Sequence, residues 1–236
     1  MKRSRLSAVI ALALALAAWP TDPLAAQVGV PPAKSPYRDI IYGNGWTPTV
    51  GYLWGDGGPL GLSPNSGMTY GVRFDFRFSG LLQGWAGLEY MDAQRMVVHP
   101  DDSLQYRFSG PVEAPLWLPT IGLQANLTGA KRWNGFAPFA AFTFGAAIGQ
   151  KAPEDSSDFD FGTKLLLAPS FGTRVFLGDR VHLRAEALAY FWKMKYPSTW
   201  LSAPEDEPTA PPPVTLDGLE DWVPTWSLRF GLGIAF

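Results

Sequence analysis

Hydrophobic and polar residues alternate along much of this chain. In TWSLRFGLGIAF, residues 225–236, large apolar residues occupy every second position, with small or polar residues between them. The same alternation runs through MTYGVRFDFRFS, residues 68–79. Side chains that repeat with a period of two lie on opposite faces of a β-strand, whereas the helical period of 3.6 would mix the two sets. The pattern therefore predicts extended strands, each with one apolar face.

Eight such strands can be placed along the sequence, with four long connections alternating with three short ones. The predicted strands span residues 46–55, 67–79, 83–97, 112–127, 135–149, 161–176, 180–195 and 222–236. Long and short connections in strict alternation are typical of an up-and-down barrel with long loops at one rim, as in outer-membrane barrels with short periplasmic turns. The predicted fold is thus all-β: an eight-stranded, antiparallel, up-and-down transmembrane β-barrel.

The apolar face of these strands is expected to point outward, into lipid. It carries bulky residues such as Phe74, Phe76 and Phe78, and an eight-stranded barrel has an interior only wide enough for a limited set of side chains. The opposite face is mostly Gly, Ala, Ser and Thr with a few charges, for example Thr143, Gly145 and Ala147. Small and polar residues fit a narrow lumen, so a polar lumen is predicted. A soluble barrel would reverse the two faces.

The first 26 residues are predicted to be a cleaved signal peptide. Basic residues precede an apolar run from Leu6 to Trp19, and the small residues Ala25 and Ala26 follow at the predicted cleavage site. Residues 27–43 then read as a short periplasmic tail, and residues 44–236 as the barrel. After the signal there is no apolar run of about 18 residues, the length that a membrane-spanning helix needs. The chain holds no cysteine, which excludes a lipoprotein anchor and disulfides.

Composition agrees with an envelope protein. Charged residues make up 17% of the 236 residues, against about a quarter in soluble domains, and aromatic residues reach 14%. The formal net charge is −2, so the concentrated basic face that nucleic acid requires is not expected. Neither a cofactor nor a metal is predicted.

The end of the chain resembles the C-terminal assembly signal of Gram-negative outer-membrane proteins. Its apolar positions are Trp226, Leu228, Phe230, Leu232, Ile234 and Phe236. The mature chain as a whole resembles the small eight-stranded barrels of the OmpA/OmpX type. Residues 112–127, VEAPLWLPTIGLQANL, are similar to the Glu-x-Pro-Leu stretch of the PorT-like barrel group. The resemblance implies a bacterial outer-membrane location, contact with lipid and lipopolysaccharide, and the barrel-assembly machinery as a partner during biogenesis.

Charged residues on the predicted inner face form the main candidate site. They are Arg73, Asp75, Arg77, Glu89, Lys164, Arg174, Arg184, Glu186 and Arg229. Because a confined charge is costly unless it is paired, Glu89 and Glu186 are expected to have arginine partners from nearby strands. The set is interpreted as salt bridges that plug the lumen and fix strand register. The alternative is a charged constriction of a narrow pore for ions or small solutes.

Other candidate chemistry is weaker. His99 precedes Asp101, Asp102 and Ser103, a set that a lipid A-modifying enzyme could use, but these are also ordinary loop residues. Two long loops are acidic and are expected to be solvated; their acids are Glu154, Asp155, Asp158, Asp160, Glu205, Asp206, Glu207, Asp217, Glu220 and Asp221. The favoured function is a structural or surface-interaction role without catalysis; a pore and an enzyme remain as alternatives.

Overall fold

The computed structural model describes residues 35–150, 152, 155, 157, 159–204 and 207–236. The chain divides into two units, Met1–Pro36 and Tyr37–Phe236. The predicted signal peptide and residues 27–34 of the predicted tail lie outside the described residues, as do Glu154, Asp158, Glu205 and Asp206. The fold is therefore that of the second unit.

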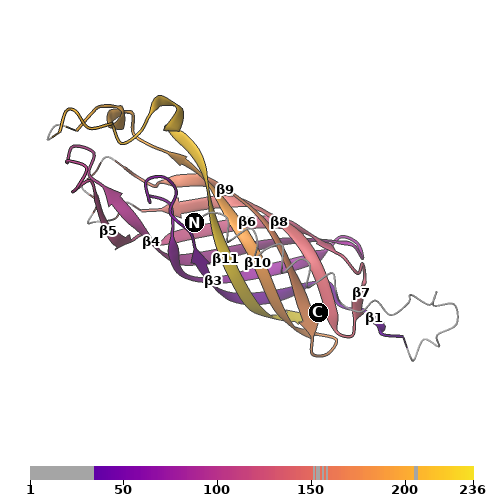
Figure 1. Ribbon diagram of the computed structural model, residues 1–236. Coiled ribbons are helices and arrows are strands. Elements are labelled where there is room, and N and C mark those ends of the chain that lie inside the picture. The colour runs from indigo at the N-terminus through magenta and orange to yellow at the C-terminus, as the bar shows by residue number, and fades with distance from the viewer. Residues whose placement is uncertain (1–34, 151, 153–154, 156, 158, 205–206) are drawn as a thin grey trace, which may run out of the picture. The chain divides into compact units, whose positions relative to one another are not determined.

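Eight strands of this unit close into an antiparallel barrel, as predicted (Figure 1). They are β2 (Gly45–Trp54), β3 (Ser66–Arg77), β4 (Leu82–Val98), β6 (Leu116–Asn126), β8 (Phe136–Gly149), β9 (Thr163–Phe176), β10 (Val181–Lys195) and β11 (Glu220–Ala235). Each pairs with its neighbour, and β11 pairs with β2, so the barrel has no free edge. Figure 1 shows the long loops at one end, the long-loop end, and the short turns at the other, the short-turn end.

The strand predicted over residues 112–127 is wrong in its first part. The structure has two strands there: β5 (Phe108–Glu113) pairs with the outer end of β4, and β6 begins at Leu116. Pro115 lies between them, and proline has no backbone N–H to donate to a sheet. The pairing of β4 with β5 also shifts register between Arg95 and Val97. The β4–β5 hairpin therefore extends beyond the barrel as part of the second long loop.

Two short strands lie at the short-turn end, where a tail and a turn were expected. β1 (Tyr37–Asp39) pairs antiparallel with β7 (Lys131–Trp133). The remaining elements are two 3₁₀ helices in the last long loop, η2 (Ser198–Leu201) and η3 (Leu216–Gly218). No helix among the described residues has the length and apolar character needed to cross a membrane.

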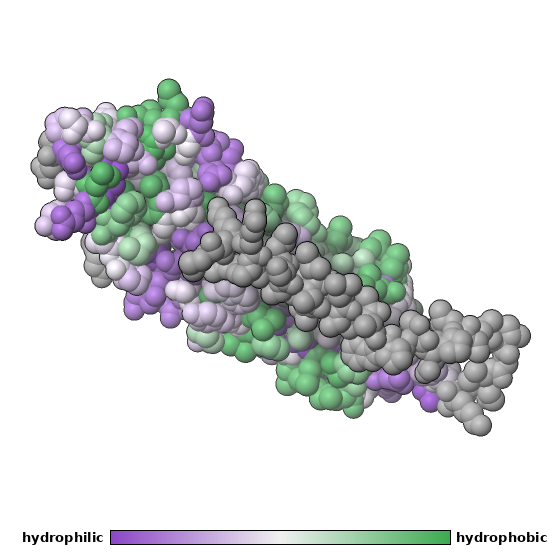
Figure 2. Space-filling view, viewed as in Figure 1, coloured by the Kyte–Doolittle hydropathy of each residue, from purple (hydrophilic) through white to green (hydrophobic). Residues whose placement is uncertain are grey.

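The outer wall of the barrel is apolar, as the alternation predicts. On β11, Phe230 is 52% exposed, while its neighbour Arg229 is 4% exposed and points into the lumen. Figure 2 shows hydrophobic side chains over the barrel wall and hydrophilic ones gathered at the long-loop end. A wall of this kind needs a lipid environment, because water would solvate it poorly.

The interior has two layers, and this corrects the expectation of a polar lumen along its full length. The layer toward the short-turn end is polar and charged. The layer toward the long-loop end is a packed apolar cluster that includes Leu53, Met91, Leu118, Leu166 and Trp192, all fully buried. These residues stand at inward positions near the loop-side ends of their strands. The small inward residues of β8 and β9 leave room for them.

Candidate functional site

The charged layer of the lumen centres on Glu186 of β10. Its Oε2 atom lies 3.0 Å from Arg184 Nε and 3.0 Å from Arg229 Nη2, and 3.9 Å from Arg73 Nη1. Its other oxygen accepts a hydrogen bond from Ser170 Oγ at 2.7 Å. Strand pairing explains part of this: Glu186 is directly opposite Arg229 on β11. One buried carboxylate thus joins four strands.

The other two carboxylates of the layer are also paired. Glu89 forms an ion pair with Arg229 and accepts a hydrogen bond from the Tyr190 hydroxyl at 2.7 Å, across the lumen. Asp75 forms an ion pair with Arg73 on the same strand, and Thr47 donates a hydrogen bond to it at 3.4 Å. The term interior charge network is used for Arg73, Asp75, Glu89, Arg174, Arg184, Glu186 and Arg229, which are all at most 8% exposed.

Three buried amides extend the network, and sequence reasoning missed them. Gln124 accepts a hydrogen bond from Arg184 Nη1 at 2.8 Å and donates to Gln83 and Asn126. Asn126 accepts a hydrogen bond from Arg174 Nη2 at 2.8 Å. The alternation along β4 and β6 could have identified them. On β4, for example, Gln83 and Glu89 are an even number of positions apart and so point to the same, inner face. The sequence prediction considered only charged residues on the inner face, and therefore did not include these neutral amides.

Aromatic rings cover two guanidinium groups of the network. The Arg184 guanidinium lies 3.9 Å from the ring centre of Phe139, and that of Arg73 lies 4.3 Å from Trp85. Both rings are buried, and a cation over an aromatic face is stabilised most where water is excluded. These rings therefore fill the spaces between ion pairs and help to satisfy the buried positive charge.

Two predicted members lie apart from the network. Arg77 is half-buried at the short-turn end, where its Nη2 donates to the backbone oxygens of Ile40 and Tyr42 at 2.9 and 3.1 Å. It thereby ties the segment before β2 to the barrel mouth. Lys164 is half-buried near the long-loop end, with its Nζ 5.8 Å from the ring centre of Phe161.

The predicted assembly segment lies on the outer wall. The six apolar side chains of the segment, from Trp226 to Phe236, are between 39% and 56% exposed. The Phe236 backbone N–H donates to Asn44 O at 2.9 Å, so the last residue is held at the seam where β11 meets the segment before β2. The ring of Phe236 lies 6.3 Å from that of Phe74. The recognition role of this segment stays a prediction.

A second buried ion pair lies among the long loops. Arg95 Nη2 is 2.6 Å from Asp155 Oδ2, and both side chains are almost fully buried. Asp155 was expected to be solvated, and this expectation is wrong. Burial alone raises the pKa of the Asp155 carboxyl, but hydrogen bonds from Ser157 and Arg95 outweigh it and hold that pKa below the ordinary value of 3.8. Arg95 could have been identified as inward-facing from the sequence, because it is an even number of positions from Glu89 on the same strand.

The candidate catalytic set of the second long loop is not assembled. His99 Nε2 lies 2.8 Å from Ser109 Oγ on β5. In the part of the chain that the structure describes, no side-chain hydrogen bond joins the His99 imidazole to Asp101, Asp102 or Ser103, and the contact to Asp102 is a backbone one, from its N–H to His99 O. Among the described residues, no group of three or more His, Asp or Glu side chains is arranged to hold a metal ion.

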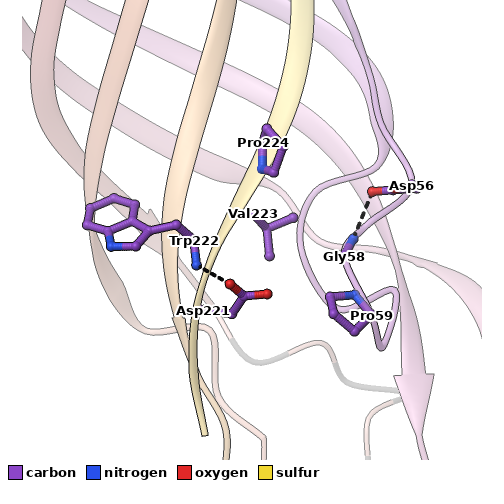
Figure 3. Close-up of a pocket in the computed structure, with 7 residues that line it drawn as sticks. All are labelled: Asp56, Gly58, Pro59, Asp221, Trp222, Val223 and Pro224. Atoms are coloured by element: carbon purple, nitrogen blue, oxygen red, sulfur yellow. Dashed lines mark hydrogen bonds between the residues drawn. The ribbon is translucent and has the colours of Figure 1, made fainter. Parts of the chain in front are cut away.

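A shallow pocket of about 340 Å³ opens beside the start of β11 (Figure 3). Val223 points toward the loop that carries Gly58 and Pro59, while the Trp222 indole points away. The two carboxylates at its rim accept local backbone hydrogen bonds, Asp56 from Gly58 and Asp221 from Trp222. Among the described residues that line it, no buried charged side chain faces the pocket. It is a surface hollow between the first long loop and the start of β11.

Comparison with known structures places the fold among small outer-membrane barrels. The outer membrane protein OprG from Pseudomonas aeruginosa matches with a TM-score of 0.51 at 12% identity, over 86% of this chain and 99% of that chain. Neisserial surface protein A (NspA) matches with a TM-score of 0.50 at 11% identity, over 86% and 98%. No protein-family model matches the sequence, and no curated protein matches it. The likeness confirms the predicted architecture and, at this identity, shows the fold alone.

Proposed function

We propose that this protein is an integral outer-membrane barrel with a structural or surface-interaction role and a lumen closed to solutes. The exposed apolar wall supports a membrane location, because monomeric soluble proteins rarely expose a continuous apolar surface of this extent. The alternation of long loops and short turns supports an orientation with the long loops outside the cell. Outer-membrane lipid, lipopolysaccharide and the barrel-assembly machinery are the partners that this location implies.

The filled interior is the observation that carries the proposal of a closed lumen. Hydrogen bonds of the network cross the barrel, from Arg184 on β10 to Gln124 on β6, and from Tyr190 on β10 to Glu89 on β4. The apolar layer, which includes Trp192, lies on the long-loop side of these hydrogen bonds. An ion would have to break buried ion pairs and then cross an apolar layer, and each step carries a high free-energy cost.

Contacts among the long loops support a role in surface interactions. The Leu104 backbone N–H donates to Glu207 Oε2 at 3.3 Å, and Arg107 Nη2 donates to Pro211 O at 3.0 Å. These contacts join the second and fourth long loops. Tyr106 and Leu216 on the same loops are 66% and 76% exposed. Loops held together in this way offer a defined surface rather than independent flexible chains. No catalytic role is proposed: among the described residues, the hydrogen bond of the His99 imidazole is the one to Ser109 Oγ, and no carboxylate accompanies it.

Single-channel recording of the purified, refolded barrel in a planar bilayer tests this function. We expect no discrete conductance from protein whose folded state is shown by its altered mobility on unheated gels. The comparison variant is Glu186→Ala, which removes the carboxylate that joins Arg184, Arg229 and Arg73 but keeps the apolar layer, so we expect it to stay closed as well. Reproducible openings in the wild type would overturn the closed lumen and favour the narrow pore.

A strain that lacks the protein tests the structural role. We expect increased entry of a hydrophobic dye through the outer membrane, reversed by the wild-type barrel. Unchanged dye entry together with unchanged binding of the cells to surfaces would contradict a structural or interaction role.

A further inference from the structure

Arg174 is the one arginine of the interior charge network without an ion pair to a described carboxylate. Arg73 contacts Asp75, and the other two arginines contact Glu186. Arg174 is 5% exposed, and its described hydrogen bond is the one from Nη2 to Asn126. Its Nε atom is buried without a partner. A buried guanidinium therefore has a donor left over.

The network also carries an excess of positive charge. It contains four arginines and three carboxylates, all buried. Because arginine keeps its proton in proteins, this leaves one uncompensated positive charge inside the barrel. A buried charge without a counter-charge is strongly unfavourable, so a counter-ion is expected close to the unpaired arginine.

A small cavity adjoins this arginine at the short-turn end. Its volume is about 10 Å³, and its lining includes Arg174, His182, Asn44, Gln83 and Asp75. That volume is the space open to the centre of a water-sized particle, so the cavity admits one small ion and is too small for a phosphate. The Asp75 carboxylate in its wall attracts Arg174, but it is also paired with Arg73 and accepts a hydrogen bond from Thr47. This one carboxylate is therefore shared between two arginines, and the network keeps its excess positive charge.

His182 supplies a second buried donor or acceptor at the same cavity. It is 5% exposed, and its Nδ1 atom has no partner. The ring lies against Gly233 on β11: a Cβ atom at that position would clash with the imidazole. It also packs 5.2 Å from Phe176, between ring centres. The imidazole is thus held in place beside Arg174, and with a proton on Nδ1 it can donate a hydrogen bond.

We propose that this cavity binds a single halide-sized monovalent anion, such as chloride, with Arg174 as its counter-charge and His182 as a hydrogen-bond donor. The anion balances the charge of the interior network and completes its packing at the short-turn end. This site goes beyond the proposed closed lumen, because it requires an ion to bind at one mouth and not to pass through.

Thermal unfolding of the refolded full-length mature barrel tests the site. Chloride is exchanged for gluconate at constant ionic strength, since gluconate is too large for the cavity. Above the dissociation constant, each tenfold increase in chloride should raise the folding equilibrium constant about tenfold. Arg174→Gln should abolish this dependence, and Lys131→Gln, which removes an exposed charge at the same end, should retain it. A wild-type barrel insensitive to chloride would overturn the proposal.

A crystal structure of the wild-type protein grown in sodium bromide gives a test that does not depend on any variant folding. The expected result is an anomalous bromide peak in the cavity, within contact of Arg174 and His182. An ordered water molecule there without anomalous signal, or an empty cavity, would overturn the anion site and leave the proposed closed lumen unaffected.

Discussion

Arg95 on β4 and Asp155 in the third long loop form a buried ion pair 2.6 Å long between residues that are 60 positions apart. The Arg95 guanidinium also lies 5.1 Å from the ring centre of Phe159. Phe159 in turn contacts Trp200 in the fourth long loop, with ring centres 6.1 Å apart. The Arg95–Asp155 ion pair and the rings of Phe159 and Trp200 therefore connect the long-loop end of the barrel to the third and fourth long loops.

Acidification should loosen this connection. Because the pKa of the Asp155 carboxyl is lowered in the folded protein, the pair stabilises the loops fully above the unfolded value, and this contribution is lost as pH falls below about 3.8. Asp155→Asn should reproduce the loosened state at pH 7. Hydrogen exchange of residues 196–204 measures the effect. The control is Asp217→Asn, on a loop acid without this contact; equal exchange in Asp155→Asn and the wild type would contradict the prediction.

Glu186→Gln should destabilise the barrel strongly. The change leaves Arg184 and Arg229 buried with one charged partner fewer, and breaking a buried pair in this way costs about 3–5 kcal/mol. Urea unfolding in lipid bilayers, followed on unheated gels, measures the free energy of unfolding. Glu220→Gln is the matched control, because Glu220 pairs with Lys193 and Lys195 in solvent and should have little effect. Equal stability of the two variants would show that the network contributes little.

Phe230→Arg should be costly because Phe230 lies on the outer apolar wall of the barrel, where it is 52% exposed. An arginine at the bilayer midplane of a barrel wall destabilises by about 2–4 kcal/mol. The same change at Phe108, on β5 beyond the barrel and 46% exposed, should be tolerated. Unfolding of both variants in bilayers checks the contrast. If Phe230→Arg is as stable as Phe108→Arg, the wall does not face lipid at this level.

Deletion of Phe236 should lower assembly into the outer membrane. The deletion removes an outward-facing aromatic residue and the backbone contact to Asn44 at the seam. The amount of folded, heat-modifiable protein in outer-membrane fractions measures assembly, with Phe236→Tyr as the variant that keeps the ring. Normal levels after the deletion would count against an assembly role for the last residue.

Strands and their faces follow directly from the alternation, because burial and exposure repeat with the same period of two along β3 and β11. Partners inside the barrel are harder to predict. The pairing of Glu186 with Arg229 can be predicted, because both point inward and their strands are neighbours. The contact of Arg184 with Gln124 cannot, because it depends on how far each side chain reaches across the lumen. The Arg95–Asp155 pair depends on the path of the third long loop, and a loop has no repeating sequence pattern from which its path could be predicted. Pro115 interrupts a pattern that otherwise reads as continuous strand.

The seam between β11 and β2 joins the two ends of the barrel sequence: Ser227 Oγ donates to Tyr52 O at 3.0 Å, across 175 positions. This pairing cannot form until β11 has been synthesised. Until then the apolar faces of the remaining strands are not covered by lipid. The edge of β2 also stays unpaired, and an unpaired edge can pair with other strands and aggregate. Closure by such distant segments is also intrinsically slow. On the proposed outer-membrane location, we expect the chain to stay unfolded until β11 is available, and the pairing of β11 with β2 to end that state.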